Sequence, residues 1–192
     1  SAEVLGAIAE IMDQSDAEAR LQVRAIPDGV YAAESQMDDD AVDLDRAVPI
    51  RVKVTVKGER MTVDLSEMSP QVKGFFNSYA GVACAQVAFK CLTSPTDYPI
   101  NEGSFRPLKV IVPSGRFISA VRPAPMRLWM CYPMTVVDTI FKALAKAVPD
   151  RTIAGHHACL ILVQLTGIDR RDGRFFIGAA GHTGGGWGAK MT

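Results

Sequence analysis

The chain has 192 residues, of which 48% are apolar and 22% charged, and its 21 basic and 21 acidic residues cancel. This composition excludes a mainly disordered chain, and no apolar run approaches the roughly 18 residues of a membrane span. A chain of this length buries about 70% of its unfolded surface on folding, so we expect a single domain over residues 1–192.

The two ends of the sequence carry opposite charge. Residues 1–45 hold 12 acidic and 2 basic residues, a net charge of −10, whereas residues 46–192 hold 9 acidic and 19 basic residues, a net charge of +10. Three interpretations are open: the acidic segment neutralises the basic body, the basic body faces a phosphate ligand or an acidic partner, or the charges are solvated independently.

The first part of the sequence is predicted to form a long helix and three strands. Apolar residues recur at helical spacing over residues 2–24, and a Pro-Asp-Gly turn ends that helix. Residues 30–37 are predicted to form a strand, followed by an acidic loop over residues 38–45. Apolar and polar residues then alternate over residues 50–57, and residues 61–65 return after a turn, which is typical of a β-hairpin.

The rest of the sequence is predicted to contain two more helices and a second hairpin. The expected elements are a loop over residues 66–78, a buried helix over residues 79–92, a loop over residues 94–103, a short strand over residues 108–112, an extended segment over residues 122–125, an amphipathic helix over residues 134–148, and a hairpin of residues 159–168 and 175–179. Without regular strand–helix alternation, these elements indicate an α+β fold, with an antiparallel or mixed sheet built from β-hairpins and packed against two or three helices.

The cysteines and histidines give no specific sign of a metal site. The four cysteines form no C-x-x-C pair and are interpreted as buried, reduced thiols, and with no secretory signal the expected location is cytoplasmic. They are Cys84, Cys91, Cys131 and Cys159. The adjacent His156 and His157, with Cys159 as a third ligand, would hold a metal only if the backbone turned between them, so packing or solvent roles are favoured.

A glycine-rich stretch lies near the end of the sequence. Backbone amides of such a turn can bind an anion, so Gly184, Gly185 and Gly186 form a candidate phosphate or anion loop. The Walker spacing is missing, and a flexible loop is the alternative. Basic residues around Trp129 accompany no nucleic-acid-binding module, and we expect neither a nucleic-acid partner nor membrane association.

Several stretches together resemble the hydantoinase B/oxoprolinase family. Their order and spacing carry the resemblance, which extends over nearly the whole chain. They are residues 26–31 leading into 38–40, residues 63–66, residues 69–74 with Asn77, residues 99–107, residues 110–115, residues 136–138, residues 143–151 and residues 184–189. The family's chains are considerably longer, so this chain resembles an internal part of an N-methylhydantoinase B-like subunit.

The resemblance implies an ATP-dependent enzyme. Family members open cyclic amides such as hydantoins or 5-oxoproline, or carboxylate ketones such as acetone and acetophenone, and a hydantoinase A-like subunit is implied as the partner that supplies the nucleotide site. For this chain it implies part of a cyclic amide hydrolase, in an oligomer with that partner and the rest of the parent chain. ATP and a divalent metal are implied for the full complex. None is expected on this fragment, which alone is expected to be inactive.

Six polar residues match the family's motif stretches without an assigned role. They are Asp64, Ser69, Gln71, Asn77, Asn101 and Arg106. Turn formation is the expected role of each, although Arg106 and the glycine loop are also of the types that bind a phosphoryl group. No catalytic residue is assigned. The sequence departs from the family at residues 126–133 and 155–158, and these departures concern the substrate pocket. Two alternatives are open: a subunit of an acetone- or acetophenone-type carboxylase within the family, and a non-catalytic scaffold or interaction domain from another class.

Overall fold

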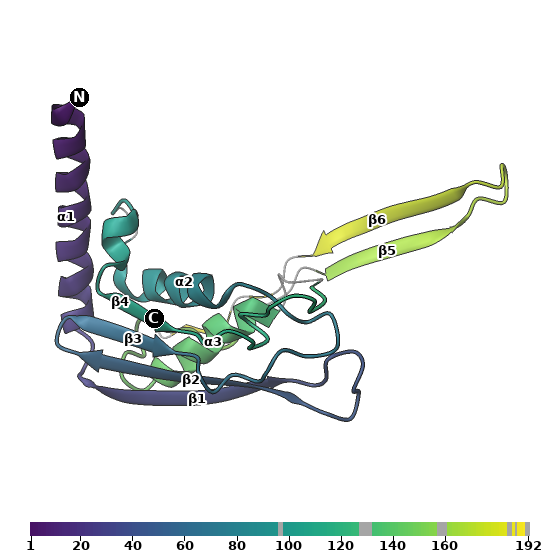
Figure 1. The fold of residues 1–192 in the computed structure, drawn as a ribbon, viewed down its shortest axis with the longest axis horizontal. Coiled ribbons are helices and arrows are strands. Elements are labelled where there is room, and N and C mark those ends of the chain that lie inside the picture. Colours follow the sequence, from purple (N-terminus) through teal and green to yellow (C-terminus); the bar gives the residue numbers. More distant parts are fainter. Residues whose placement is uncertain (96–97, 127–131, 157–160, 184–185, 187, 191–192) are drawn as a thin grey trace.

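The computed structural model describes residues 1–95, 98–126, 132–156, 161–183, 186 and 188–190. Among these residues, helices α1 (Ala2–Arg24), α2 (Gly81–Thr93) and α3 (Tyr132–Leu144) accompany a four-stranded sheet and a separate hairpin (Figure 1). The strands are β1 (Gly29–Met37), β2 (Val48–Lys57), β3 (Arg60–Asp64), β4 (Leu108–Ile111), β5 (Ile161–Ile168) and β6 (Phe175–Thr183). The predicted α+β class and mixed sheet are confirmed.

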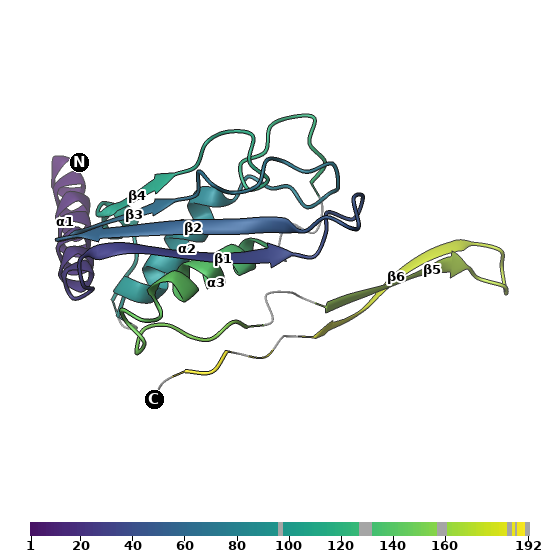
Figure 2. The same ribbon diagram turned by 90° about the horizontal axis from the view of Figure 1, so that it is seen from below.

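The sheet has one covered face and one open face (Figure 2). Its strand order is β1-β2-β3-β4, in which the first two pairings are antiparallel and the β3–β4 pairing is parallel. Alternate residues of β2 are buried, as expected for a strand with one solvated face. They are Val48, Ile50, Val52, Val54 and Val56. Helices α2 and α3 pack against the covered face. The charged residues of β2 that alternate with these buried side chains therefore lie on the open face.

The core joins the covered face of the sheet to the apolar sides of α2 and α3. In α2 the buried residues include Ala88, Phe89 and Leu92, and in α3 they include Ile140 and Leu144. Full burial of one such large apolar side chain contributes roughly 1.5–3 kcal/mol. These side chains therefore hold the helical layer on the sheet, which leaves the opposite face for other contacts.

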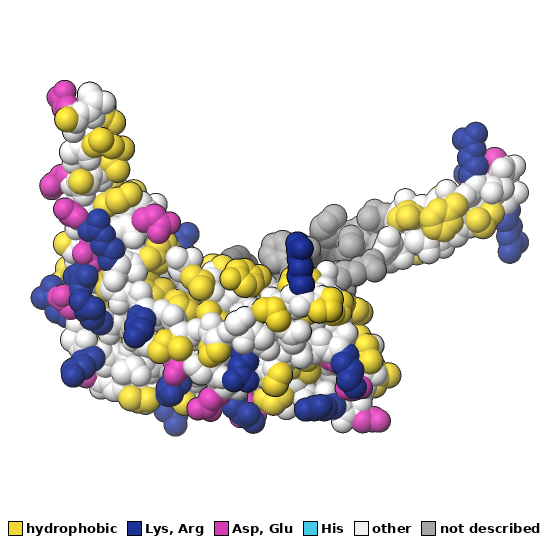
Figure 3. Space-filling model, viewed as in Figure 1, with side chains coloured by type: hydrophobic (Ala, Val, Ile, Leu, Met, Phe, Trp, Pro, Cys, Tyr) yellow, Lys and Arg dark blue, Asp and Glu magenta, His cyan; other side chains and the backbone are white. Residues whose placement is uncertain are grey.

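Helix α1 and the β5–β6 hairpin project from this body (Figures 1 and 3). The second half of α1 is anchored through buried Ala19 and Val23, whereas residues 1–10 are exposed. Apolar side chains are exposed on both projections. They are Val4, Leu5, Ile8 and Ile11 on α1, and Leu165, Ile168, Phe175, Phe176 and Ile177 on the hairpin. No helix among the described residues is long and apolar enough to cross a membrane.

Part of the acidic segment is neutralised by the basic body. Carboxylates from before residue 46 form ion pairs with basic side chains from after it, as the first interpretation of the charge distribution predicts. The pairs are Asp13 with Arg106 at 2.5 Å, Glu34 with Arg51 at 2.9 Å and Asp43 with Lys73 at 2.9 Å.

Several local predictions need correction. The helix predicted over residues 134–148 is α3, which ends at Leu144 and is followed by a turn. The predicted extended segment at residues 122–125 contains a turn with a cis Arg122–Pro123 peptide bond, and the Ala124 N–H donates to the Val121 carbonyl at 3.1 Å. The loop over residues 94–103 leads into a short 3-10 helix, η1 (Glu102–Phe105).

The prediction of buried thiols is correct for Cys84 and wrong for Cys91, which is exposed. The buried stripe of α2 runs along Ala88 and Leu92, and Cys91 falls beyond its edge. Cys131 and Cys159 lie outside the described residues.

Candidate functional site

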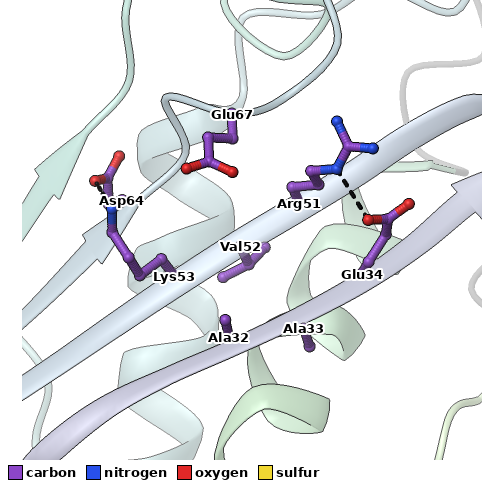
Figure 4. A pocket seen from close by; sticks show the side chains of 8 residues that line it. All are labelled: Ala32, Ala33, Glu34, Arg51, Val52, Lys53, Asp64 and Glu67. Atoms are coloured by element: carbon purple, nitrogen blue, oxygen red, sulfur yellow. Dashed lines mark hydrogen bonds and ion pairs between the residues drawn. The ribbon is translucent and has the colours of Figure 1, made fainter.

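A pocket of about 420 Å³ lies on the open face of the sheet (Figure 4). Small and apolar residues of β1 and β2 lie between charged side chains from β1, β2, β3 and the loop after β3. The lining residues are Ala32, Ala33, Glu34, Arg51, Val52, Lys53, Asp64 and Glu67. The pleat of the strands places Glu34, Arg51 and Lys53 together on this face.

Two cross-strand ion pairs border the pocket. Arg51 Nε lies 2.9 Å from Glu34 Oε2, and Lys53 Nζ lies 3.1 Å from Asp64 Oδ2. In both cases the partners are directly opposite in the strand register. Glu67 has no hydrogen bond or ion pair to any described residue, so it is the carboxylate available to a further contact at this pocket.

Asp64 is the least exposed charged group of the two pairs, with 17% of its side chain accessible. Burial acts to raise its pKa, but hydrogen bonds from the Ser66 hydroxyl and backbone N–H, together with Lys53, outweigh burial and lower the pKa below its usual value. Asp64 is therefore a carboxylate at neutral pH. The Ser66 N–H donates to Asp64 Oδ1 at 2.9 Å, and turn formation stays the predicted role of this side chain.

A groove of about 470 Å³ adjoins this pocket and shares Arg51 and Glu67 with it. The predicted site residues Ser69 and Gln71 line the groove. The Ser69 hydroxyl donates to the Pro49 carbonyl at 3.0 Å, and Gln71 Oε1 accepts from the Val121 N–H at 3.0 Å. Ser69 thus fastens its loop to β2, and Gln71 fastens the same loop to the segment at Val121, while both residues line the groove.

Asn77 is fully buried, and among the described residues its side chain bonds to backbone groups alone. Its Oδ1 accepts from the Val72 N–H at 2.8 Å, and its Nδ2 donates to the carbonyls of Val72, Gly74 and Pro125 at 2.9–3.0 Å. The side chain therefore ties the loop after β3 to the segment before α3. These bonds give Asn77 a place in holding the two loops together, and turn formation stays its predicted role.

Asn101 and Arg106 lie at the other end of the body and fix α1. Asn101 caps η1 through the Gly103 N–H and donates to the Ser15 hydroxyl at 2.8 Å. Arg106 pairs with Asp13. Its guanidinium is therefore committed to α1 rather than directed into the groove. Of the six motif residues, Asp64 lines the pocket and Ser69 and Gln71 line the adjoining groove, whereas Asn77, Asn101 and Arg106 line neither.

The glycine loop is described only in part. Gly184 and Gly185 lie outside the described residues, and Gly186 is exposed. Gly188 lies against the backbone of Ala154, because a Cβ there would be 1.7 Å from the Ala154 carbonyl oxygen. The Ala154 N–H also donates to the Ala189 carbonyl at 2.9 Å. The end of the glycine-rich stretch is thereby held beside residues 153–155.

Asp138 and His156 form a second polar arrangement that carried no assigned role. His156 Nδ1 lies 2.7 Å from Asp138 Oδ1. The sequence offered a signal, because Asp138 stands in one motif stretch and His156 in a departure from another. Their 18-residue separation prevented any prediction that they touch. His157 and Cys159 lie outside the described residues.

No three His, Cys, Asp or Glu side chains lie close enough to hold a metal ion within the described part of the chain. These residues therefore do not fit the divalent metal that the resemblance implies for the full complex.

Comparisons with known proteins agree on one family. The family profile described as hydantoinase B/oxoprolinase matches residues 1–192. The beta subunit of caprolactamase from Pseudomonas jessenii is 34% identical over 159 residues, which are 80% of this chain and 27% of that one. A D-/L-hydantoinase B-type protein of Pseudomonas sp. (strain NS671) is also 34% identical, over 79% of this chain and 28% of that one. The chain thus spans less than a third of the length of these relatives.

Solved structures give the same result for the fold. The crystal structure of an ATP-dependent caprolactamase from Pseudomonas jessenii matches 92% of this chain and 31% of that chain, with a TM-score of 0.78 and 28% identity. A nucleotide-free acetone carboxylase matches 90% of this chain and 25% of that chain, with a TM-score of 0.68 and 14% identity. The latter likeness concerns the fold alone.

Proposed function

Because this chain belongs to the hydantoinase B/oxoprolinase family, we propose that it is part of an ATP-dependent cyclic amide hydrolase that acts with a hydantoinase A-like partner. The observation that carries the proposal is the likeness to caprolactamase. It combines 34% sequence identity over 80% of this chain with a shared fold over 92% of it. Caprolactam is a cyclic amide, like hydantoin and 5-oxoproline, so the substrate class is a lactam or a related ring.

We assign the open face of the sheet to contacts with the partner or with the rest of the parent protein. The pocket and the adjoining groove are bordered by charges of both signs, and most of these side chains are about half exposed. Exposed ion pairs of this kind contribute only about 0–1 kcal/mol to stability. Their arrangement therefore suits the recognition of a polar surface, and no nucleophile with an adjacent base is among the described residues that line the pocket.

The activity is tested on the parent protein together with its hydantoinase A-like partner. ADP release is measured with ε-caprolactam, hydantoin and 5-oxoproline, and in a parallel set with acetone or acetophenone plus bicarbonate. The proposal expects ADP release to rise at least tenfold with one of the cyclic amides and to need both subunits. Reactions without substrate and with either protein alone are the controls.

The same assay separates the alternatives. A rise in ADP release only with a ketone and bicarbonate would favour the carboxylase. Release that responds to neither substrate class would favour a scaffold or interaction role. The acetone carboxylase likeness at 14% identity supports the carboxylase less strongly than the caprolactamase likeness supports the hydrolase.

A further inference from the structure

The pair formed by Asp138 and His156 lies on the helical layer, away from the open face of the sheet. Asp138 is in the second turn of α3, and its two carboxylate oxygens serve the same partner. Oδ1 lies 2.7 Å from His156 Nδ1, and Oδ2 accepts from the His156 backbone N–H at 3.3 Å. Both side chains are mostly buried, with 14% of Asp138 and 19% of His156 exposed. Asp138 therefore holds His156 both through the imidazole ring and through the backbone N–H.

Within the described part of the chain, this arrangement leaves the other ring nitrogen without a hydrogen-bond partner. Since the carboxylate accepts the Nδ1 proton, the neutral ring carries no proton on Nε2, which is then a base. Nε2 has no hydrogen-bond partner among the described residues. A base held in one orientation by a carboxylate and left open at its second nitrogen has the geometry required for proton transfer.

Two glycines lie beside His156 and place no side chain over it. Gly155 precedes it, and a Cβ on Gly155 would lie 3.9 Å from Asp138 Oδ2. Gly188 packs on Ala154 with no room for a side chain, and an isolated β-bridge joins Ile153 to Lys190. The backbone around His156 is thus fixed from two sides, while no bulky side chain from residues 155 or 188 covers it.

We propose that His156 is the proton-transfer residue of ring opening and that Asp138 is its positioning residue. This inference rests on the proposed cyclic amide hydrolase function. ATP first gives a phosphoryl group to the amide oxygen, and ADP leaves. Nε2 then takes one proton from a water molecule as the water oxygen bonds to the activated amide carbon, and the second water proton passes to solvent. The ring C–N bond breaks, and the imidazolium returns its proton to the leaving nitrogen, which becomes an amine. A second water then releases phosphate from the acyl phosphate and leaves the carboxyl group, and the histidine is regenerated.

The alternative is that His156 only fastens the loop after α3 to that helix. The variant His156→Asn separates the two roles, because an asparagine amide can still donate to Asp138 from the position of Nδ1 but has no group at the position of Nε2. In the complete complex we expect H156N to lower kcat at least 100-fold, with a melting temperature within about 2 °C of the wild type. H156A, which loses the hydrogen bond as well, is expected to be both inactive and less stable.

Asp138 is tested by a change that keeps its shape. The variant Asp138→Asn is expected to lower kcat about tenfold or more with KM within twofold, because the ring loses its orientation but the substrate contacts remain. If D138N instead lowers the melting temperature and does not lower kcat selectively over KM, Asp138 has a structural role. Full activity of H156N would overturn the proposal while leaving the proposed hydrolase function intact.

A measurement independent of turnover covers the case in which the parent complex opens no cyclic amide. Diethyl pyrocarbonate modifies unprotonated imidazole nitrogens, and the extent of modification at His156 is read by mass spectrometry of the native complex. We expect the rate at which His156 is modified in the native protein to lie within about tenfold of its rate in the unfolded protein. Absence of modification until unfolding would show that Nε2 is closed to water, which would overturn the assignment whatever the substrate.

Discussion

The Gly74 N–H donates to Asp40 Oδ2 at 3.1 Å, and Gly74 has no room for a side chain beside Asp40. A Cβ on Gly74 would lie 1.5 Å from the Asp40 carbonyl oxygen. The contact joins the acidic loop after β1 to the loop that carries Ser69 and Gln71. These two loops form the groove beside the pocket, so the shape of the groove depends on this close approach.

The variant Gly74→Ala tests that dependence. The added methyl group forces the two loops apart, and overpacking of this kind costs about 1–3 kcal/mol or more. We therefore expect a clear fall in the free energy of unfolding, measured by urea denaturation. The matched control is Gly6→Ala on the exposed part of α1, where a Cβ meets nothing within 4 Å. It should be neutral or stabilising by up to about 1 kcal/mol. Equal stability of the two variants would contradict the account.

Asp40 is expected to make the same loop sensitive to acid. Hydrogen bonding to the Asp43 N–H lowers its pKa, burial opposes this, and further backbone bonds from Gly74, Val42 and Lys73 add to the lowering, so the pKa lies below its usual 3.8. A pKa lower in the folded than in the unfolded state means that the carboxylate stabilises the fold above about pH 4. This contribution is lost as the pH falls through the folded pKa.

The prediction for Asp40→Asn follows from that sign. The variant should be less stable than the wild type from about pH 7 to pH 5, and the difference in urea midpoint should narrow below about pH 4. A difference that stays constant down to about pH 2.5 would mean that ionisation of Asp40 does not stabilise the loop.

Asn77 is predicted to be the polar residue whose loss is most damaging to this region. Asn77→Ala leaves the Val72 N–H and the carbonyls of Val72, Gly74 and Pro125 without their partner, and each buried unsatisfied group costs about 1–3 kcal/mol. We expect a loss of at least about 3 kcal/mol in thermal or urea unfolding. The exposed Gln14, bonded only to Glu10, serves as the control, and Gln14→Ala should change stability by less than about 0.5 kcal/mol.

Local sequence patterns were sufficient for most helices and strands. The apolar spacing over residues 2–24 predicted α1, and the alternation over residues 50–57 predicted β2 and its return into β3. The parallel pairing of Met61 in β3 with Leu108 in β4 could not be predicted, because it spans a long crossover that contains α2. Hydrophobic periodicity identifies an element but not its neighbour in a sheet.

The candidate site shows the same limit. Family motifs singled out Asn77, Asn101 and Arg106, and the structure gives these side chains contacts that hold loops and α1. The motif label itself does not distinguish a residue that shapes a site from one that acts in it. The Asp138–His156 contact depends on how α3 packs against the following loop, so neither spacing nor composition reveals it.

The two described cysteines are expected to differ sharply in reactivity. Burial raises the pKa of the Cys84 thiol to about 12, so almost none of it is thiolate at about pH 8, whereas Cys91 is exposed. With N-ethylmaleimide at about this pH, peptide mass spectrometry should find Cys91 labelled in the native protein and Cys84 labelled only after unfolding. Labelling of both at similar rates in the native state would show that α2 does not pack as described.

We propose that this chain belongs to an enzyme that couples ATP to the opening of a cyclic amide. The most direct measurement is the amount of ADP and of ring-opened product formed by the complete complex, followed together over time. The account predicts that the two rise in a fixed ratio and that neither forms when ATP or the cyclic amide is omitted. Ring opening without ATP, or ADP release that no cyclic amide increases, would contradict it.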